Sequence, residues 1–123
     1  MGLDVYAVRS PYVELTDEDE LAFEEAGIEL CGGIYSGGGS SFRGKVYDTL
    51  VLDLTDVSLY QVWIPPETVK QMADALRRVD PQQFEKDLAK KYTWESYSSH
   101  TIEHLCKFFD ICASRGLGLA GSW

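Results

Sequence analysis

The pattern most suggestive of chemistry lies between Gly39 and Lys45, where the sequence reads G-S-S-F-R-G-K. This G-x-x-x-x-G-K spacing is that of a phosphate-binding loop, in which backbone N–H groups surround the phosphates and the lysine supplies a point charge. Two features argue against a nucleotide triphosphatase. Val46 stands where the magnesium-binding Ser or Thr should follow the lysine, and only a short apolar stretch precedes the loop where a long buried strand is expected.

A simpler anion site remains open in the same segment. If a helix begins near Arg43, its positive N-terminal end lies beside glycine backbone and two cations, and it could hold a phosphate, sulfate or carboxylate without magnesium. We call this hypothesis the anion seat, and its residues are Gly37, Gly38, Gly39, Ser40, Ser41, Arg43 and Lys45. The alternative is that Ser40 or Ser41 caps the helix while the two cations pair with acidic side chains.

His100 and His104 belong to the sequence H-T-I-E-H, which matches the inverted zinc-protease motif. Histidines four residues apart face the same way on a helix, and the glutamate between them could act on a bound water. Such enzymes need a third ligand well downstream, and Asp110 is the only carboxylate that follows. We therefore expect two histidines on a helix surface, no metal and no cofactor, with a metal site at His100 and His104 as the weaker alternative.

The cysteines Cys31, Cys106 and Cys112 are irregularly spaced, which argues against a disulfide framework and indicates a reducing, cytoplasmic compartment. Cys31 beside two glycines could act as a nucleophile, but a small buried apolar side chain explains it as well. No complete catalytic set is visible, which favours a non-enzymatic role.

Charge is distributed unevenly along the chain, whose formal net charge is −9. Between Ser10 and Phe42 there is no basic residue, but there are eight acidic ones, namely Glu14, Asp17, Glu18, Asp19, Glu20, Glu24, Glu25 and Glu29. Such a field repels nucleic acid and anionic lipid and attracts basic proteins, although a solvated helix face would look similar. No apolar run approaches the length that spans a bilayer, so we expect neither nucleic acid nor membrane as a partner.

Aromatic residues are concentrated in one polar stretch, where Tyr92, Trp94 and Tyr97 could present an interaction surface. Together with the acidic segment, they favour an accessory protein that masks a basic protein partner, much as an immunity protein does. The alternative function is a small-molecule binder or enzyme that uses the anion seat. The sequence leaves the oligomeric state open.

Hydrophobic periodicity predicts a single α+β domain over residues 1–123, with several helices packed on a small sheet that includes the first and last strands. Strands are expected at residues 3–8 and 117–123, with a short extended segment at 59–64. A helix capped by Thr16 or Asp17 should run to Ala26 and stop at Gly27, with Leu21, Phe23 and Ala26 inward.

Four further helices are expected. Residues 46–54 fit a helix better than a buried strand, and Pro66 should begin the clearest helix, which runs to Val79. Asp80 should cap another helix, and the last should lie within residues 93–115. The inward sets are Val69, Met72, Ala73 and Leu76 for the helix at 66–79, Phe84 and Leu88 after Asp80, and Ile102, Leu105, Cys106, Phe109 and Ala113 in the last.

A glycine turn followed by S-F-R-G-K (residues 32–45), an I-P-P-E-T helix start (residues 64–68) and a G-L-G-L ending (residues 116–119) occur together in this chain. In these features the chain resembles a group of small uncharacterised bacterial proteins, over most of its length from Cys31 onward. No activity is assigned to that group, so the resemblance implies a bacterial cytosolic domain and no mechanism. The opening M-G-L-D-x-Y is also faintly similar to short phage-type proteins.

Overall fold

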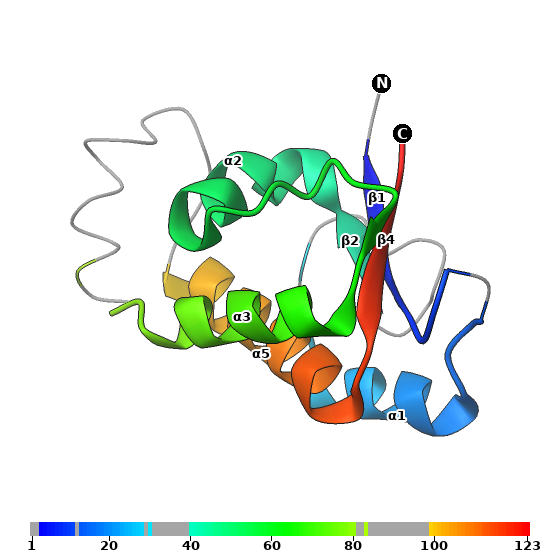
Figure 1. Ribbon diagram of the computed structural model, residues 1–123. Helices are drawn as coiled ribbons and strands as arrows, with labels where there is room; N and C mark the ends of the chain where they lie inside the picture. Colours follow the sequence, from blue (N-terminus) through cyan, green and yellow to red (C-terminus); the bar gives the residue numbers. More distant parts are fainter. Residues whose placement is uncertain (1–2, 12, 29, 31–39, 81–82, 84–98) are drawn as a thin grey trace.

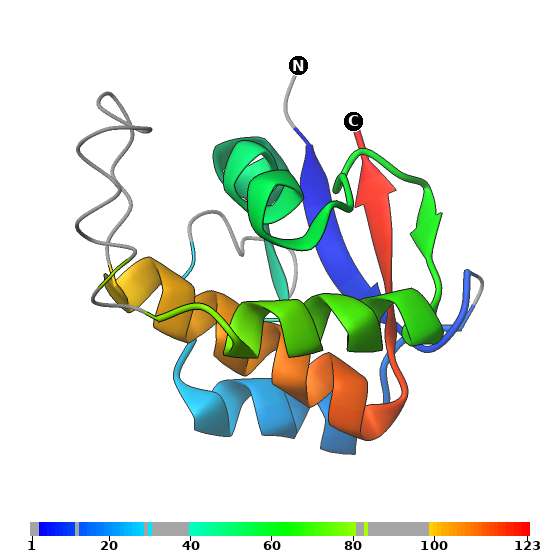
Figure 2. The same cartoon turned by 60° about the vertical axis from the view of Figure 1, so that its left-hand side comes forward.

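Helices α2, α3 and α5 lie on one face of a four-stranded sheet, and α1 packs beside α5 (Figures 1 and 2). The computed structural model describes residues 3–11, 13–28, 30, 40–80, 83 and 99–123. In chain order its elements are β1 (Asp4–Val8), α1 (Asp17–Ala26), β2 (Ser41–Arg43), α2 (Gly44–Thr55), β3 (Trp63–Ile64), α3 (Pro66–Arg77), α5 (Ser99–Arg115) and β4 (Gly118–Ser122). The predicted α+β class is confirmed.

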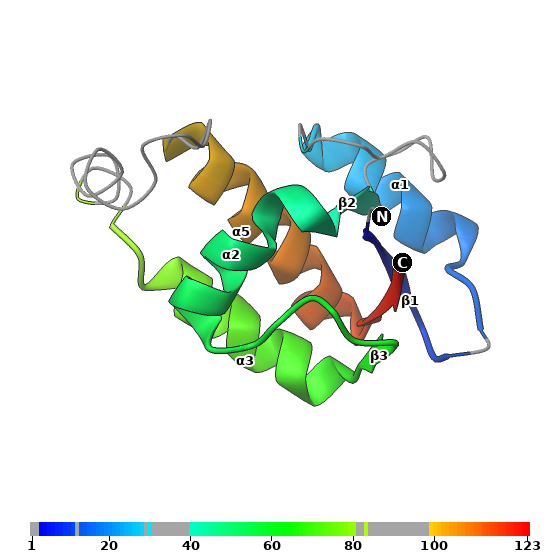
Figure 3. The ribbon, with the colours of Figure 1, turned by 90° about the horizontal axis from the view of Figure 1, so that it is seen from above.

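The sheet has the strand order β2-β1-β4-β3, and all neighbouring strands are antiparallel. Its centre is the pairing of β1 with β4, from Asp4 opposite Ser122 to Val8 opposite Gly118. The expected pairing of the first strand with the last is therefore confirmed. The three-residue β2 and the two-residue β3 form the edges, and the view from above shows α1 at the β2 side of the molecule (Figure 3).

Residues 46–54 are helical, as the spacing predicted, because α2 buries Tyr47, Leu50 and Val51 on one side. Leu52, which a buried strand would have enclosed, is 43% exposed. The helix begins at Gly44, which packs tightly on β1: a Cβ atom at this position would lie 2.5 Å from Val5 Cγ2.

The core is formed by the helical faces that the periodicity indicated. The α3 set is confirmed in full, since Val69, Met72, Ala73 and Leu76 are all buried. In α5, Ile102, Leu105 and Phe109 are buried, whereas the predicted Cys106 and Ala113 are only partly buried. Phe108, missed by the prediction, joins Phe23 and Phe42 in an aromatic cluster, with ring centroids 5.2 Å and 4.9 Å away.

Helix α1 differs from expectation in its inward face. Leu21 was expected to be inward and is 50% exposed, while Asp19 and Phe23 are the buried residues of this helix. Asp19 and Phe23 are four residues apart and share one side, so Leu21, two residues from each, lies on the other side. The caps at Thr16 and Gly27 are confirmed.

The helix expected after Asp80 falls mostly outside the described residues, including Phe84 and Leu88. Its described part agrees with a capped start, because the backbone N–H of Gln83 donates to Asp80 Oδ1 at 3.5 Å. The last helix is described from Ser99 and ends before Gly116, whose φ of +67° is the left-handed geometry of a helix stop.

A fully buried carboxylate, that of Asp19, connects three segments. Arg9 donates to both of its oxygens, from Nε to Oδ2 at 2.7 Å and from a terminal nitrogen to Oδ1 at 2.8 Å. Arg115 Nε donates to Oδ1 at 2.7 Å. The backbone N–H of Thr16 donates to Oδ2 at 3.0 Å, and Thr16 Oγ1 accepts from the Asp19 N–H at 3.2 Å, which completes a capping box.

These contacts decide the ionisation of Asp19. Burial opposes the charged form and would by itself raise its pKa. Hydrogen bonds from the Thr16 backbone and from the guanidinium groups of Arg115 and Arg9 outweigh burial and hold the pKa of Asp19 well below its usual range. The carboxylate is therefore charged in the folded protein.

Replacing Asp19 by Asn should lower the free energy of unfolding by about 2 kcal/mol, less than for a fully buried pair because both arginines are partly exposed to water. The substitution leaves two guanidinium groups facing a neutral amide. Urea unfolding at neutral pH would measure the loss. Asp17→Asn, an exposed change in the same helical turn, is the control; an equal loss in both variants would contradict the role of the buried carboxylate.

The same carboxylate should make stability depend on pH. Because its folded pKa is depressed, its contribution is complete above the pKa of an unfolded aspartate, about 3.9, and is lost as pH falls from there towards the folded value. The difference in unfolding free energy between the wild type and Asp19→Asn should thus stay constant from pH 7 to about 5 and shrink below about pH 4. A difference that is unchanged in strong acid would refute this.

Candidate functional site

The sheet face opposite α2, α3 and α5 is not covered by these three helices, and among the described helices only α1 borders it (Figures 1 and 3). Leu3, Val5 and Ala7 are buried on the helix side, so the alternation along β1 directs Asp4 and Tyr6 to the open side. Tyr6 is paired with Ser41 on β2 and with Ala120 on β4. Directly paired residues share a face, so these side chains form a row across the open side.

The row continues on β3, where Trp63 is the strand partner of Ala120. The ring of Trp63 is half-buried because it covers Gly118, where an added Cβ would collide with the indole. At the C-terminal end of β4, Tyr60 and Trp123 are exposed and stack edge to face with centroids 5.7 Å apart. The open side of the sheet therefore carries the aromatic side chains of Tyr6 and Trp63.

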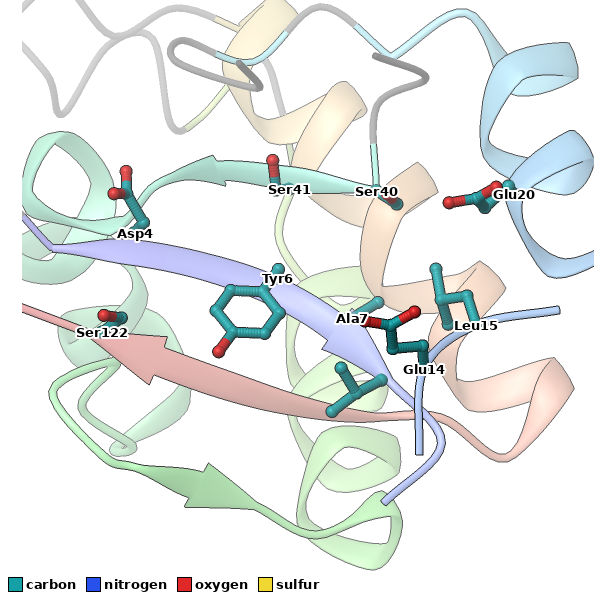
Figure 4. Close-up of a pocket in the computed structure, with 10 residues that line it drawn as sticks. Asp4, Tyr6, Ala7, Glu14, Leu15, Glu20, Ser40, Ser41 and Ser122 are labelled. Atoms are coloured by element: carbon teal, nitrogen blue, oxygen red, sulfur yellow. The ribbon is translucent and has the colours of Figure 1, made fainter. Parts of the chain in front are cut away.

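A pocket of about 510 Å³ lies along β1 on this open side (Figure 4). Asp4 and Ser122 lie towards one end, and Glu14, Leu15 and Glu20 towards the other, with Tyr6 between (Figure 4). The full described lining is Asp4, Tyr6, Ala7, Val8, Glu14, Leu15, Glu20, Ser40, Ser41 and Ser122. We refer to it as the β1 pocket.

The β1 pocket is acidic. Its lining contains the carboxylates of Asp4, Glu14 and Glu20, and no Lys, Arg or His occurs among the described lining residues. None of the three carboxylates forms a salt bridge with a described residue, in contrast to the fully paired Asp19 nearby. Their charges therefore face the pocket and the solvent, although the exposed Arg43 stands opposite Asp4 on the neighbouring strand.

Ser40 contributes a buried polar group to the same pocket. The residue is only 4% exposed, and its carbonyl oxygen accepts the Ala7 N–H at 2.9 Å. Its hydroxyl lines the pocket and forms no hydrogen bond with any described residue. Because no fully buried side-chain oxygen in the described part of the chain lacks a partner, this hydroxyl oxygen must be open to the pocket, where a ligand or water can bond to it.

The structure describes only part of the anion seat, because Gly37, Gly38 and Gly39 lie outside the described residues. A helix does begin there, at Gly44, but no side chain caps it: Ser40 and Ser41 are buried and Ser41 belongs to β2. The Gly44 N–H is engaged by the Leu3 carbonyl at 2.7 Å. Arg43 and Lys45 are exposed, without a salt bridge to any described residue. The seat stays a prediction.

The remaining candidate residues fall into two groups. Tyr92, Trp94, Tyr97 and Cys31 lie outside the described residues, as does the side chain of His100. His104 is buried instead of lying on the helix surface, because it sits on the side of α5 that carries Leu105 and Phe108 into the core. Within the described part of the chain, no three His, Cys, Asp or Glu side chains are grouped so that they could hold a metal ion.

The two described cysteines are poor nucleophiles. Burial raises the pKa of the fully enclosed Cys112 thiol. Burial, assisted by the Asp110 carboxylate, also raises the pKa of Cys106. A thiol must ionise to attack, so neither residue is suited to covalent catalysis.

Sequence reasoning missed the β1 pocket. Two of its carboxylates, Glu14 and Glu20, belong to the acidic segment that was recognised, but nothing local indicated that they would meet Asp4 and Tyr6. The alternation of residues 3–8 was the available signal, since it places Asp4 and Tyr6 on the same face of a strand.

None of the helices in the described ranges is both long enough and apolar enough to cross a membrane. No protein-family model, no curated protein and no solved structure matches this chain.

Proposed function

We propose that this protein is a non-enzymatic accessory protein that binds a basic protein partner through the open face of its sheet. The observation that carries the proposal is the acidic β1 pocket on the sheet face opposite α2, α3 and α5 (Figure 1). Unpaired carboxylates beside exposed aromatic rings form a surface that is complementary to cationic side chains.

The aromatic residues supply the contact area for such a complex. Tyr6 and half-buried Trp63 lie on the open face, and the exposed pair Tyr60 and Trp123 lies at the C-terminal end of β4. Aromatic side chains are enriched at protein interfaces because they bury a large area at low entropic cost. Val62, next to Trp63, is exposed at the β3 edge of the sheet and adds apolar surface there.

The negative charge of the protein favours basic partners over acidic ones and raises the rate of association with them. The net charge of −9 and the absence of basic residues between Ser10 and Phe42 give a negative field on the side where α1 and the β1 pocket lie. Such a field raises the rate of encounter with a basic protein and disfavours acidic ones. By covering a basic surface, the protein would act as a mask for its partner, in the manner of an immunity protein.

The anion seat is the alternative function, favoured by the exposure of Arg43 and Lys45. The two functions predict opposite effects of one substitution. Arg43 pairs with Asp4 across β2 and β1, so it lies on the open face. Arg43→Ala should strengthen binding of a basic partner by removing a repulsive charge, whereas it should abolish phosphate binding to an anion seat.

Binding of the partner should weaken with salt and depend on Tyr6. After purification of the partner from the native host at low ionic strength, we expect its affinity to fall by at least about tenfold between 50 and 500 mM salt, because screening shortens the reach of the charges. Tyr6→Ala should cost about 1–2 kcal/mol of binding energy as measured by calorimetry.

Leu21→Ala is the matched control, since it removes an exposed apolar side chain that lies on α1 and not on the sheet. Thermal unfolding of both variants would show that the fold is retained. The proposal fails if no protein is retained, if affinity does not respond to salt, or if Tyr6→Ala binds as well as Leu21→Ala.

A further inference from the structure

We propose that the β1 pocket binds a guanidinium group, presented by an arginine side chain of the protein partner. The role of the partner rests on the function proposed above, whereas the chemistry of the pocket is argued from its own residues. Three independent features of the pocket point to this ligand: its charge, its free hydroxyl and its aromatic wall.

The charge requires a cation. Asp4 comes from β1, Glu14 from the segment before α1 and Glu20 from α1, and all three line one pocket without a compensating lysine, arginine or histidine in the described lining. Two described cations lie near these carboxylates: Arg9, which is bound to Asp19 through two hydrogen bonds, and the exposed Arg43, which stands opposite Asp4 on β2. The negative charge is therefore strongest at the end of the pocket formed by Glu14 and Glu20, away from Arg43 (Figure 4).

The cation should be an organic one and not a metal ion. A divalent metal needs several oxygen ligands gathered within coordination distance. The described carboxylates do not form such a group, and Figure 4 shows Asp4 at the opposite end of the pocket from Glu14 and Glu20. Carboxylates spread along a groove suit a larger cation with donors pointing in several directions.

The hydroxyl oxygen of Ser40 can accept a hydrogen bond from a donor group of the ligand. Ser40 is buried, its hydroxyl has no partner among the described residues, and Figure 4 shows it on the strand end nearest Glu20. An oxygen of this kind can accept from an N–H group while a carboxylate beside it accepts from another. A guanidinium has five N–H donors in a fixed plane, which matches a wall of several acceptors.

The ring of Tyr6 favours arginine over lysine. Tyr6 is 39% exposed, and Figure 4 looks onto its ring between the two acidic ends of the pocket. A planar guanidinium can stack on such a ring while its edge donates to carboxylates, and a compact ammonium cannot do both. The ligand should therefore be an arginine side chain.

Titration of the whole protein with N-acetyl-arginine amide, followed by NMR, tests this assignment. Shifts should concentrate at the backbone signals of Tyr6, Glu14 and Ser40. N-acetyl-citrulline amide, which has nearly the same shape without the charge, should bind at least about tenfold more weakly, and N-acetyl-lysine amide should lie between the two. Equal binding of the citrulline compound, or shifts spread over the surface without the pocket, would overturn the proposal.

Variants locate the interaction. Glu20→Gln should weaken binding of the arginine compound by about tenfold and Ser40→Ala by about threefold, since a charge-assisted contact contributes more than a neutral one. Tyr6→Leu should remove the preference for arginine over lysine. Glu18→Gln is the control, because this exposed residue has the same charge on the same helical turn but does not line the pocket. Equal weakening by Glu18→Gln and Glu20→Gln would show a general charge effect and overturn the proposal.

The experiments distinguish a failure of the guanidinium site from a failure of the proposed function. If the purified partner displaces the arginine compound and Glu20→Gln weakens both, the proposal is supported in full. A partner that binds through Tyr6 while the arginine compound does not bind would leave the function intact and overturn the pocket. Specific binding of the arginine compound that no partner displaces would retain the guanidinium site and overturn its assignment to the partner.

Discussion

The carboxylate of Asp19 accepts hydrogen bonds from the end of β1, from the start of its own helix and from the end of α5, through Arg9, Thr16 and Arg115. These contacts hold α1 against the sheet and thereby place Glu20 beside β1. They also engage the guanidinium of Arg9, which would otherwise be available to the nearby acids. A single buried charge thus holds Glu20 beside β1 and engages the guanidinium nearest to this end of the β1 pocket.

Local patterns in the sequence were sufficient for most of the fold. The faces of α2 and α3 follow from the spacing of apolar residues, and caps such as Thr16 and Gly27 mark where α1 begins and ends. The buried face of α1 could not be predicted in this way, because it is set by Asp19. An acidic residue becomes an inward residue only when its partners exist, and Arg115 lies 96 positions away in the chain.

For the candidate site too, the features that could be predicted are contiguous in the sequence, whereas the missed ones depend on contacts between distant residues. The anion seat was recognised because its glycines and cations are contiguous, yet the Gly44 N–H is used by Leu3 to join α2 to β1. The acidity of residues 14–29 was visible too, but the pocket combines only Glu14 and Glu20 of this segment with Asp4, Tyr6 and Ser40. Which of these residues meet in the pocket depends on strand pairing and on the packing of α1, and neither can be predicted from a short stretch of sequence.

The central pairing of the sheet, β1 with β4, joins segments separated by nearly the whole chain. Closing so long a loop costs conformational entropy before any ladder contact is gained, and domains dominated by such distant pairings cross a higher kinetic barrier than helical bundles of similar size. Contacts between helices close in sequence, such as α2 and α3, can form earlier. The open face, which consists of β1 and its neighbours, is therefore the part of the molecule that we expect to assemble last.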